Sequence, residues 1–526
     1  MKKLFLVLIN LIVIMGGVNA QEICSMANPD NNDIEALQLG ICSNPNVRIN
    51  NDRFFPMPDD PIKTVRLNFI FLQRPGDEAA GIGGYHLSNP NHLALWTDVV
   101  AYMNETMGHF EVQYDASDCS WNEYVDTRIR FAVDMLNIED AYYWNNENGY
   151  SSGNSASNCT GTDICPNTDT WYAINLHDDI NNSVDECSRS INVFFTENET
   201  EYENVINGLA YESCATSCSK YPNNPQTSTP NLRVNMVDKY IRLQGFIDWG
   251  NTSDIWVWDW DADVPNTTRH EMVRDYGNHI LHELGHSFDL PHTNNSSQWP
   301  FPESSCNLMC NTGYCTTDDT HPYSLTEIQL KAMHKALSVK TTREYVEGCV
   351  FNENRVIEIN QDELWDDDIK VYKNIVVKSG ATLTLSCVLH MPPNSKIIVE
   401  RGGKLIIDGA TITNTCNCNR WQGIEVHGKS NIAHNTLFGT NNVENLTVAD
   451  YENLNLDANG PGVVILKNDA IIENAGSAIT TKKRASGGDS NYYGGIVYAE
   501  NSTFANNRRA VEFMRYAPQN YSQFRN

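Results

Sequence analysis

Basic residues are scarce in this sequence. Its 526 residues include 37 Lys and Arg but 66 Asp and Glu, which gives a formal net charge of −29 at pH 7. Such a surplus of negative charge repels the phosphates of nucleic acids and the surfaces of anionic membranes. We therefore expect neither as a partner.

Long apolar runs are missing after residue 20. No later segment reaches the ~18 apolar residues that a membrane-spanning helix needs, so we predict no membrane span. The first 20 residues hold a shorter apolar run, from Leu4 to Met15. Lys2 and Lys3 precede this run, and a segment that ends in the small residue Ala20 follows it. This order is typical of a secretory signal peptide. It predicts a mature chain that begins near Gln21 and is secreted, in the extracellular space or at the cell surface.

The signal-peptide segment also lacks cysteine, because all 15 cysteines follow it. In an exported protein, cysteines are expected to form disulfides. The close pairs Cys159/Cys165 and Cys214/Cys218 are candidates for local bridges, while the full connectivity stays open. The odd count leaves one thiol that is either free or paired outside this chain.

The most informative motif is HELGHSFDLPH, residues 282–292. His282 and His286 are four residues apart and would share one face of a helix. His292 could join them if the chain leaves the helix and turns back. Three neutral imidazoles suit Zn²⁺ and leave its fourth position open for water. Glu283 would lie beside the metal, where it can act as the general base.

A helix around this motif is predicted by the spacing of the apolar residues before it. Met272, Tyr276, Ile280 and Leu284 recur every four residues. This is the pattern of an amphipathic helix of the length that the site needs.

The motif resembles the metzincin signature of HExxH, a third histidine and a methionine turn, for which Met309 in the segment 306–310 is the candidate. The stretches 274–293 and 325–334 are most similar to the pappalysin-like branch. The resemblance implies an α/β (α+β) catalytic domain, one catalytic zinc ion, a protein or peptide substrate, and Met309 as the apolar floor of the site. Asp289 stands where the family has glycine. We expect positive φ there, which Asp tolerates better than most residues.

Other residues near the motif are weaker candidates. Some metzincins use a tyrosine two residues after the methionine, but that position is Asn311 here, and Tyr314 lies three residues further on. His279 and His334 are expected to be surface or packing residues rather than ligands.

The sequence offers two further candidate metal sites. Asp259, Asp261 and Asp263 could bind Ca²⁺, but Val264 and His270 exclude an EF-hand, and a solvated acidic loop is the alternative. A thiolate from Cys24 or Cys42 could also cap the zinc ion in a latent form, the alternative being a disulfide between them.

The chain divides into regions of different pattern. Residues 21–62 are polar and read as an N-terminal extension or pro-segment, followed by a zinc metalloprotease domain at 63–349. Within that domain we predict a helix at Leu95–Met107 and strands at the following positions: Val65–Phe71, Thr127–Val133 and Ser190–Phe195. This order is expected of an α/β metalloprotease.

Residues 350–526 predict an all-β solenoid. The segment 375–385 is echoed 22 residues later at 397–407, with Gly380 and Gly402 aligned, and the segment 470–479 is echoed 32 residues later at 502–511. Such echoes indicate stacked coils. They resemble a right-handed parallel β-helix; a β-sandwich is the alternative. Asn414, Asn474 and Asn506 are interpreted as turn residues rather than a carbohydrate site. No polar capping coil follows, which favours a solenoid that continues in a longer protein.

Three functions are compatible with these patterns. The first is a secreted zinc-dependent endopeptidase in which Glu283 is the general base. The second is a β-helix adhesin or carbohydrate-binding protein with a vestigial protease domain. The intact residues His282, Glu283, His286 and His292 argue against that reading. The third is a zinc hydrolase of other amides or esters.

Overall fold

The computed structural model describes residues 51–525 with gaps. The residues between these bounds that it does not describe are 74–75, 77–84, 114–122, 140–189, 197–206, 211–239, 245–265, 289, 291–306, 310–323, 340, 416–418, 485–488 and 517. By its internal contacts the described chain divides into two compact units: residues 54–58 and 62–347 form the first, and residues 51–53, 59–61 and 348–525 form the second.

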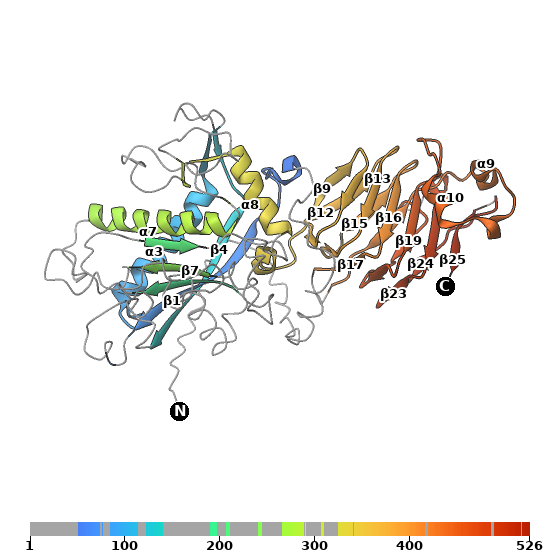
Figure 1. Ribbon diagram of the computed structural model, residues 1–526. Helices are drawn as coiled ribbons and strands as arrows, with labels where there is room; N and C mark the ends of the chain where they lie inside the picture. Colours follow the sequence, from blue (N-terminus) through green and yellow to red (C-terminus); the bar gives the residue numbers. More distant parts are fainter. Residues whose placement is uncertain are drawn as a thin grey trace, which may run out of the picture. The chain divides into compact units, whose positions relative to one another are not determined.

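The first unit is built on a mixed five-stranded sheet in the order β4-β1-β5-β7-β6 (Figure 1). The strands are β1 (Lys63–Gln73), β4 (Ile129–Glu139), β5 (Ile191–Thr196), β6 (Asn207–Ala210) and β7 (Tyr240–Gln244). Four of them are parallel, and β6 pairs with β7 in the antiparallel sense at one edge. The three strands predicted from the sequence are confirmed as β1, β4 and β5.

Helix α3 (Pro90–Gly108) follows β1, and it confirms the helix expected at Leu95–Met107. The side chain of Asn89 accepts a hydrogen bond from the Asn91 backbone N–H, and Pro90 occupies the first turn, where its missing N–H costs nothing. Apolar residues on one face of this helix are buried, namely Leu95, Trp96, Val99, Met103 and Met107.

A smaller sheet in the order β3-β2-β8 completes the strands described in this unit. It contains β2 (Phe110–Gln113), β3 (Glu123–Val125) and β8 (Ser324–Thr326). Helix α8 (Glu327–Val339) begins directly after β8. Of the stretch 325–334, Leu325 and Thr326 belong to the strand and the remaining residues to the helix. His334 is buried, and its Nε2 lies 2.7 Å from the Thr127 carbonyl oxygen, so it is a packing residue as predicted.

The second unit is a stack of parallel strands in three sheets (Figure 1). The first sheet contains β10 (Glu363–Trp365), β13 (Thr382–Leu385), β16 (Lys404–Asp408), β19 (Val463–Lys467), β22 (Ile496–Glu500) and β25 (Gln523–Arg525). The second contains β11 (Ile369–Lys370), β14 (Leu389–Met391), β17 (Thr411–Asn414), β20 (Ile471–Glu473) and β23 (Thr503–Ala505). The third contains β9 (Asn352–Ile359), β12 (Lys373–Val377), β15 (Lys396–Val399), β18 (Gly423–Val426), β21 (Ile479–Thr480) and β24 (Val511–Glu512). Successive strands join the three sheets in rotation, which is compatible with a parallel β-helix.

The pairing registers confirm both sequence echoes. Ile375 pairs with Ile397, and Ile471 pairs with Thr503, which are the 22- and 32-residue offsets read from the sequence. At the aligned turn, Gly380 and Gly402 both have positive φ, and the Gly380 N–H donates to the Gly402 carbonyl. Because stacked coils repeat the same local turn, this conformation recurs one coil later.

The interpretation of asparagine as a turn residue is confirmed for two of the three positions. Asn474 and Asn506 have φ of 58° and 53°. Asn414 is the exception, because it ends β17 and pairs with Met391 without a positive φ.

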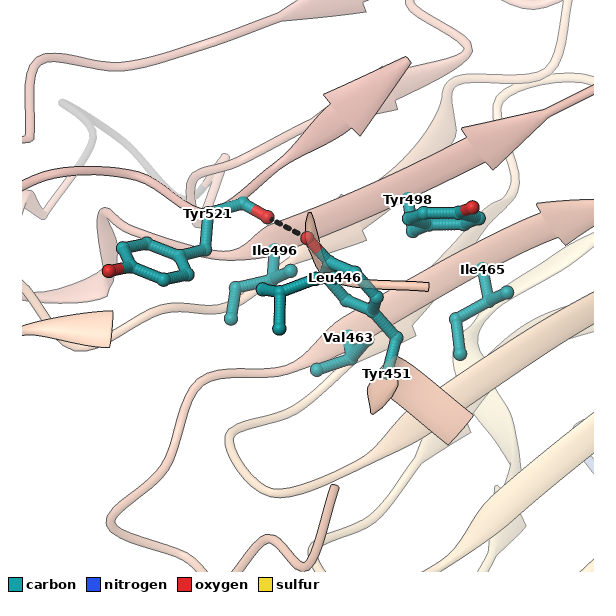
Figure 2. Packing of buried hydrophobic residues seen from close by; sticks show 7 residues of the cluster. All are labelled: Leu446, Tyr451, Val463, Ile465, Ile496, Tyr498 and Tyr521. Carbon is teal, nitrogen blue, oxygen red and sulfur yellow. Dashed lines mark hydrogen bonds between the residues drawn. The ribbon is translucent and has the colours of Figure 1, made fainter. Parts of the chain in front are cut away.

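An insertion between β18 and β19 covers one face of the stack. It contains α9 (His434–Phe438), η7 (Val443–Asn445) and α10 (Val448–Glu452). Figure 2 shows the apolar cluster at this place, in which the Tyr451 hydroxyl donates to the Tyr521 carbonyl over 2.6 Å. The cluster covers the outer side of β19 and β22, which explains why the run Val463–Leu466 is buried on both faces.

The residues before β1 are divided between the two units. Asp59 and Asp60 form ion pairs with Arg355 and Lys373, at 2.5 and 2.8 Å, within the second unit. This part of the predicted N-terminal extension therefore packs with the β-stack. Among the helices described here, none has both the length and the hydropathy to cross a membrane.

Candidate metal centre

Helix α7 (Asn266–Ser287) carries the first half of the motif, and it confirms the helix predicted from apolar spacing. Its buried residues recur three and four positions apart and face the protein interior: Val273, Tyr276, Ile280, Leu281 and Leu284. Burial of this face orients the other residues of the helix. It thereby sets the direction in which His282 and Glu283 point.

Helix α3 fixes the rotation and register of α7. The rings of Trp96 and Tyr276 stack with centroids 5.4 Å apart. The Tyr276 hydroxyl lies 3.0 Å from that of Tyr85, and burial raises the pKa of Tyr85, so the Tyr85 hydroxyl keeps its proton. Tyr102 donates to Asn278 Oδ1 over 3.0 Å. These polar contacts favour the observed register, because a shift would separate the buried hydroxyls of Tyr85 and Tyr276.

The imidazole of His282 is oriented by a backbone carbonyl 26 residues away. Its Nδ1 lies 2.6 Å from the carbonyl oxygen of Leu308. A carbonyl oxygen can only accept, so the proton of the ring resides on Nδ1, and Nε2 carries the lone pair in the neutral tautomer. This arrangement is the usual one for a metal-binding histidine, whose second nitrogen donates to a carbonyl or carboxylate.

The side chain of Glu283 is 5% exposed. Glutamate is rarely this buried in proteins. It follows His282 on α7, so its backbone position beside a metal held by His282 is set by the helix. A carboxylate shielded from bulk water is suited to holding and moving a proton next to that metal.

Met309 packs against helix α7 at Gly285. It is fully buried, and a Cβ placed on Gly285 would lie 2.4 Å from the Met309 sulfur. Position 285 therefore has to be glycine for Met309 to approach α7 so closely. This role of Gly285 was not predicted from the sequence. The signal available there was its place between His282 and His286.

The end of α7 is held by a bond across six residues. The Leu290 N–H donates to the Gly285 carbonyl over 3.0 Å, as in a Schellman motif. In this motif the residue before the donor generally adopts positive φ. Asp289 itself lies outside the described residues, so its conformation stays a prediction.

The complete three-histidine site is likewise not tested. His292 and the side chain of His286 lie outside the described part of the chain, as do Asn311, Tyr314 and the Asp259–Asp263 segment. In what is described, no group of three or more His, Cys, Asp or Glu side chains could hold a metal ion. Cys24 and Cys42, the candidates for a latent cap, also fall outside. Cys349 and Cys387 are both disulfide-bonded, so neither is the odd thiol.

Among the described residues, His282 is the one proposed ligand, and its contact with the Leu308 carbonyl suits a metal-binding histidine. His282 has its proton placed on Nδ1, Glu283 is buried beside it, and Met309 lies beneath. No protein-family model matches the chain, and no curated protein matches it.

Proposed function

We propose that this protein is a secreted zinc-dependent endopeptidase of the metzincin type, similar to the pappalysin-like branch. The observation that carries the proposal is the bond between His282 Nδ1 and the Leu308 carbonyl, formed by the turn that also places Met309 under Gly285. A helix histidine with its proton directed to a carbonyl, beside a buried glutamate, is the arrangement that a zinc ligand and its general base need.

His282, His286 and His292 would hold the metal. A zinc ion bound there would lower the pKa of its water and polarise the substrate carbonyl. Glu283 would accept a proton from that water and pass it to the leaving amine. Burial of Glu283 and packing of Met309 keep bulk water away from the proton transfer. The motif alone does not exclude other amides or esters as substrates, but the methionine turn favours peptides.

We also propose that the second unit is a right-handed parallel β-helix and that the signal peptide directs export. In the competing adhesin hypothesis this β-stack does the work and the first unit is vestigial. That hypothesis predicts a first unit without turnover, whereas ours predicts turnover that depends on zinc and on Glu283.

The test is metal analysis of the full chain, followed by digestion of a denatured protein with and without a chelator. We expect one zinc per chain and activity that the chelator abolishes. Glu283→Gln should keep zinc but lose turnover by roughly 10²–10⁴-fold, the range for loss of a general base. His286→Ala should lose the metal. His270→Ala is the matched control, because this histidine is exposed on the same helix. Full zinc occupancy in His286→Ala would remove the proposed site.

A further inference from the structure

The turn at 307–309 is fastened to the start of α8 by two buried amides. Asn307 Nδ2 donates to Gln329 Oε1 over 2.8 Å, and Gln329 Nε2 donates back to Asn307 Oδ1 over 3.1 Å. Both side chains are almost fully buried, at 2% and 4% exposure. A reciprocal pair of buried amides holds both groups in one orientation, because rotating either one puts donor against donor.

Gln329 also caps α8. Its Oε1 accepts from the Thr326 N–H over 2.9 Å, while the Gln329 N–H donates to Thr326 Oγ1 over 3.3 Å. This reciprocal arrangement is a capping box, here Thr-Glu-Ile-Gln. The same glutamine therefore caps the start of a helix and holds Asn307, 22 residues earlier in the chain.

The backbone of the same turn is held by two further hydrogen bonds. Asn307 Oδ1 accepts from the Met309 N–H over 2.9 Å, and the Leu308 N–H donates to the Ser324 carbonyl over 2.9 Å. With the N–H groups on both sides of it anchored, the Leu308 carbonyl points at His282.

We propose that Gln329 is a positioning residue for the metal ligand His282. It acts through Asn307: the amide pair holds the turn, the turn aims the Leu308 carbonyl, and that carbonyl keeps the His282 proton on Nδ1 and Nε2 toward the metal. Gln329 touches neither metal nor substrate. The metal in this proposal rests on the proposed function, whereas the orientation of the His282 ring does not.

The experiment compares two variants of the full chain that both damage the capping box. Gln329→Met removes the cap and the amide pair, whereas Thr326→Val removes the hydroxyl of the cap and leaves the Asn307–Gln329 pair. Affinity for Zn²⁺ alone is measured by chelator competition at a temperature where circular dichroism shows both proteins folded. We expect Gln329→Met to bind zinc about 10–100-fold more weakly, the range for loss of an outer-shell partner. Thr326→Val should bind as the unaltered protein does. Equal zinc affinity in the two variants would overturn the proposal.

A double-mutant cycle tests the route through Asn307. If Gln329 acts only through that residue, then adding Gln329→Met to Asn307→Ala should weaken zinc binding no further. Fully additive losses would contradict the route.

The tautomer of His282 separates this proposal from the proposed function. Ring ¹⁵N signals of ¹⁵N-histidine-labelled protein, with His282→Gln to assign them, should show Nδ1–H in the unaltered protein and a mixture in Gln329→Met. If the unaltered protein binds no zinc, the proposed function fails, and the ¹⁵N result alone decides the positioning role. An unchanged tautomer in Gln329→Met would then overturn it.

Discussion

Replacing Gly285 by alanine tests the packing of the methionine turn against α7. An ideal Cβ at this position would lie 2.4 Å from Met309 Sδ, 3.2 Å from its Cε and 3.6 Å from Leu290 Cδ1. The side chain of Met309 could in principle move aside, but Met309 and Leu290 are both fully buried. Any shift therefore has to displace other core atoms.

The expected sign is opposite to that of an ordinary helix position. Gly→Ala inside a helix normally stabilises by about 1 kcal/mol. Inserting a methyl into a packed core costs about 1–3 kcal/mol. We therefore expect Gly285→Ala to change the free energy of unfolding by between zero and about 2 kcal/mol, in the destabilising direction. It should also weaken zinc binding, because Met309 adjoins the Leu308 carbonyl that orients His282.

The matched control is the same substitution in a Met309→Ala background. There the clashing sulfur is gone, so Gly285→Ala should stabilise by up to about 1 kcal/mol. Denaturant unfolding of the four proteins, followed by tryptophan fluorescence, gives the coupling energy, which we expect to be about 1–3 kcal/mol. Equal stabilisation in both backgrounds would refute the contact between Gly285 and Met309.

Three further predictions concern other parts of the chain. Burial lowers the pKa of His434 to about 4, and its Nδ1 accepts from the Tyr521 N–H over 3.1 Å. Because this pKa lies below the ordinary value of 6.5, the second unit should lose about 3 kcal/mol of stability as pH falls from 6.5 to 4. A plot of the free energy of unfolding against pH should have a slope in this range that His434→Gln removes. An unaltered slope in that variant would contradict the assignment to His434. Asp289→Gly should leave zinc affinity unchanged if the residue only makes the turn, whereas a loss of tenfold or more would assign it a hydrogen bond to a ligand imidazole. A fragment spanning 21–351 should fold, bind zinc and cleave peptides, even though it lacks Lys373, the ion-pair partner of Asp60. If the fragment is insoluble or metal-free when it is made under oxidising conditions, the domain boundary is wrong.

Much of the β-stack could be predicted from the sequence. Parallel coils place equivalent residues side by side, so a repeat at a constant offset states the pairing register directly. Ile375 with Ile397 and Ile471 with Thr503 followed from that rule. The insertion over β19 could not be foreseen in this way, since its apolar residues contact strands that follow it at no fixed spacing.

In the first unit, the sequence alone determined helices α3 and α7 and strands β1, β4 and β5, because apolar spacing of two or near 3.6 residues is a direct consequence of backbone geometry. It also placed His282 and Glu283 on one helix. Only the tertiary structure decided which groups orient them. The Leu308 carbonyl, the Gly285–Met309 contact and the Asn307–Gln329 pair join segments 20 or more residues apart. Such contacts have no period in the sequence, since they depend on how separate elements pack. The reciprocal pair of Gln329 with Asn307 likewise exists only in the folded chain.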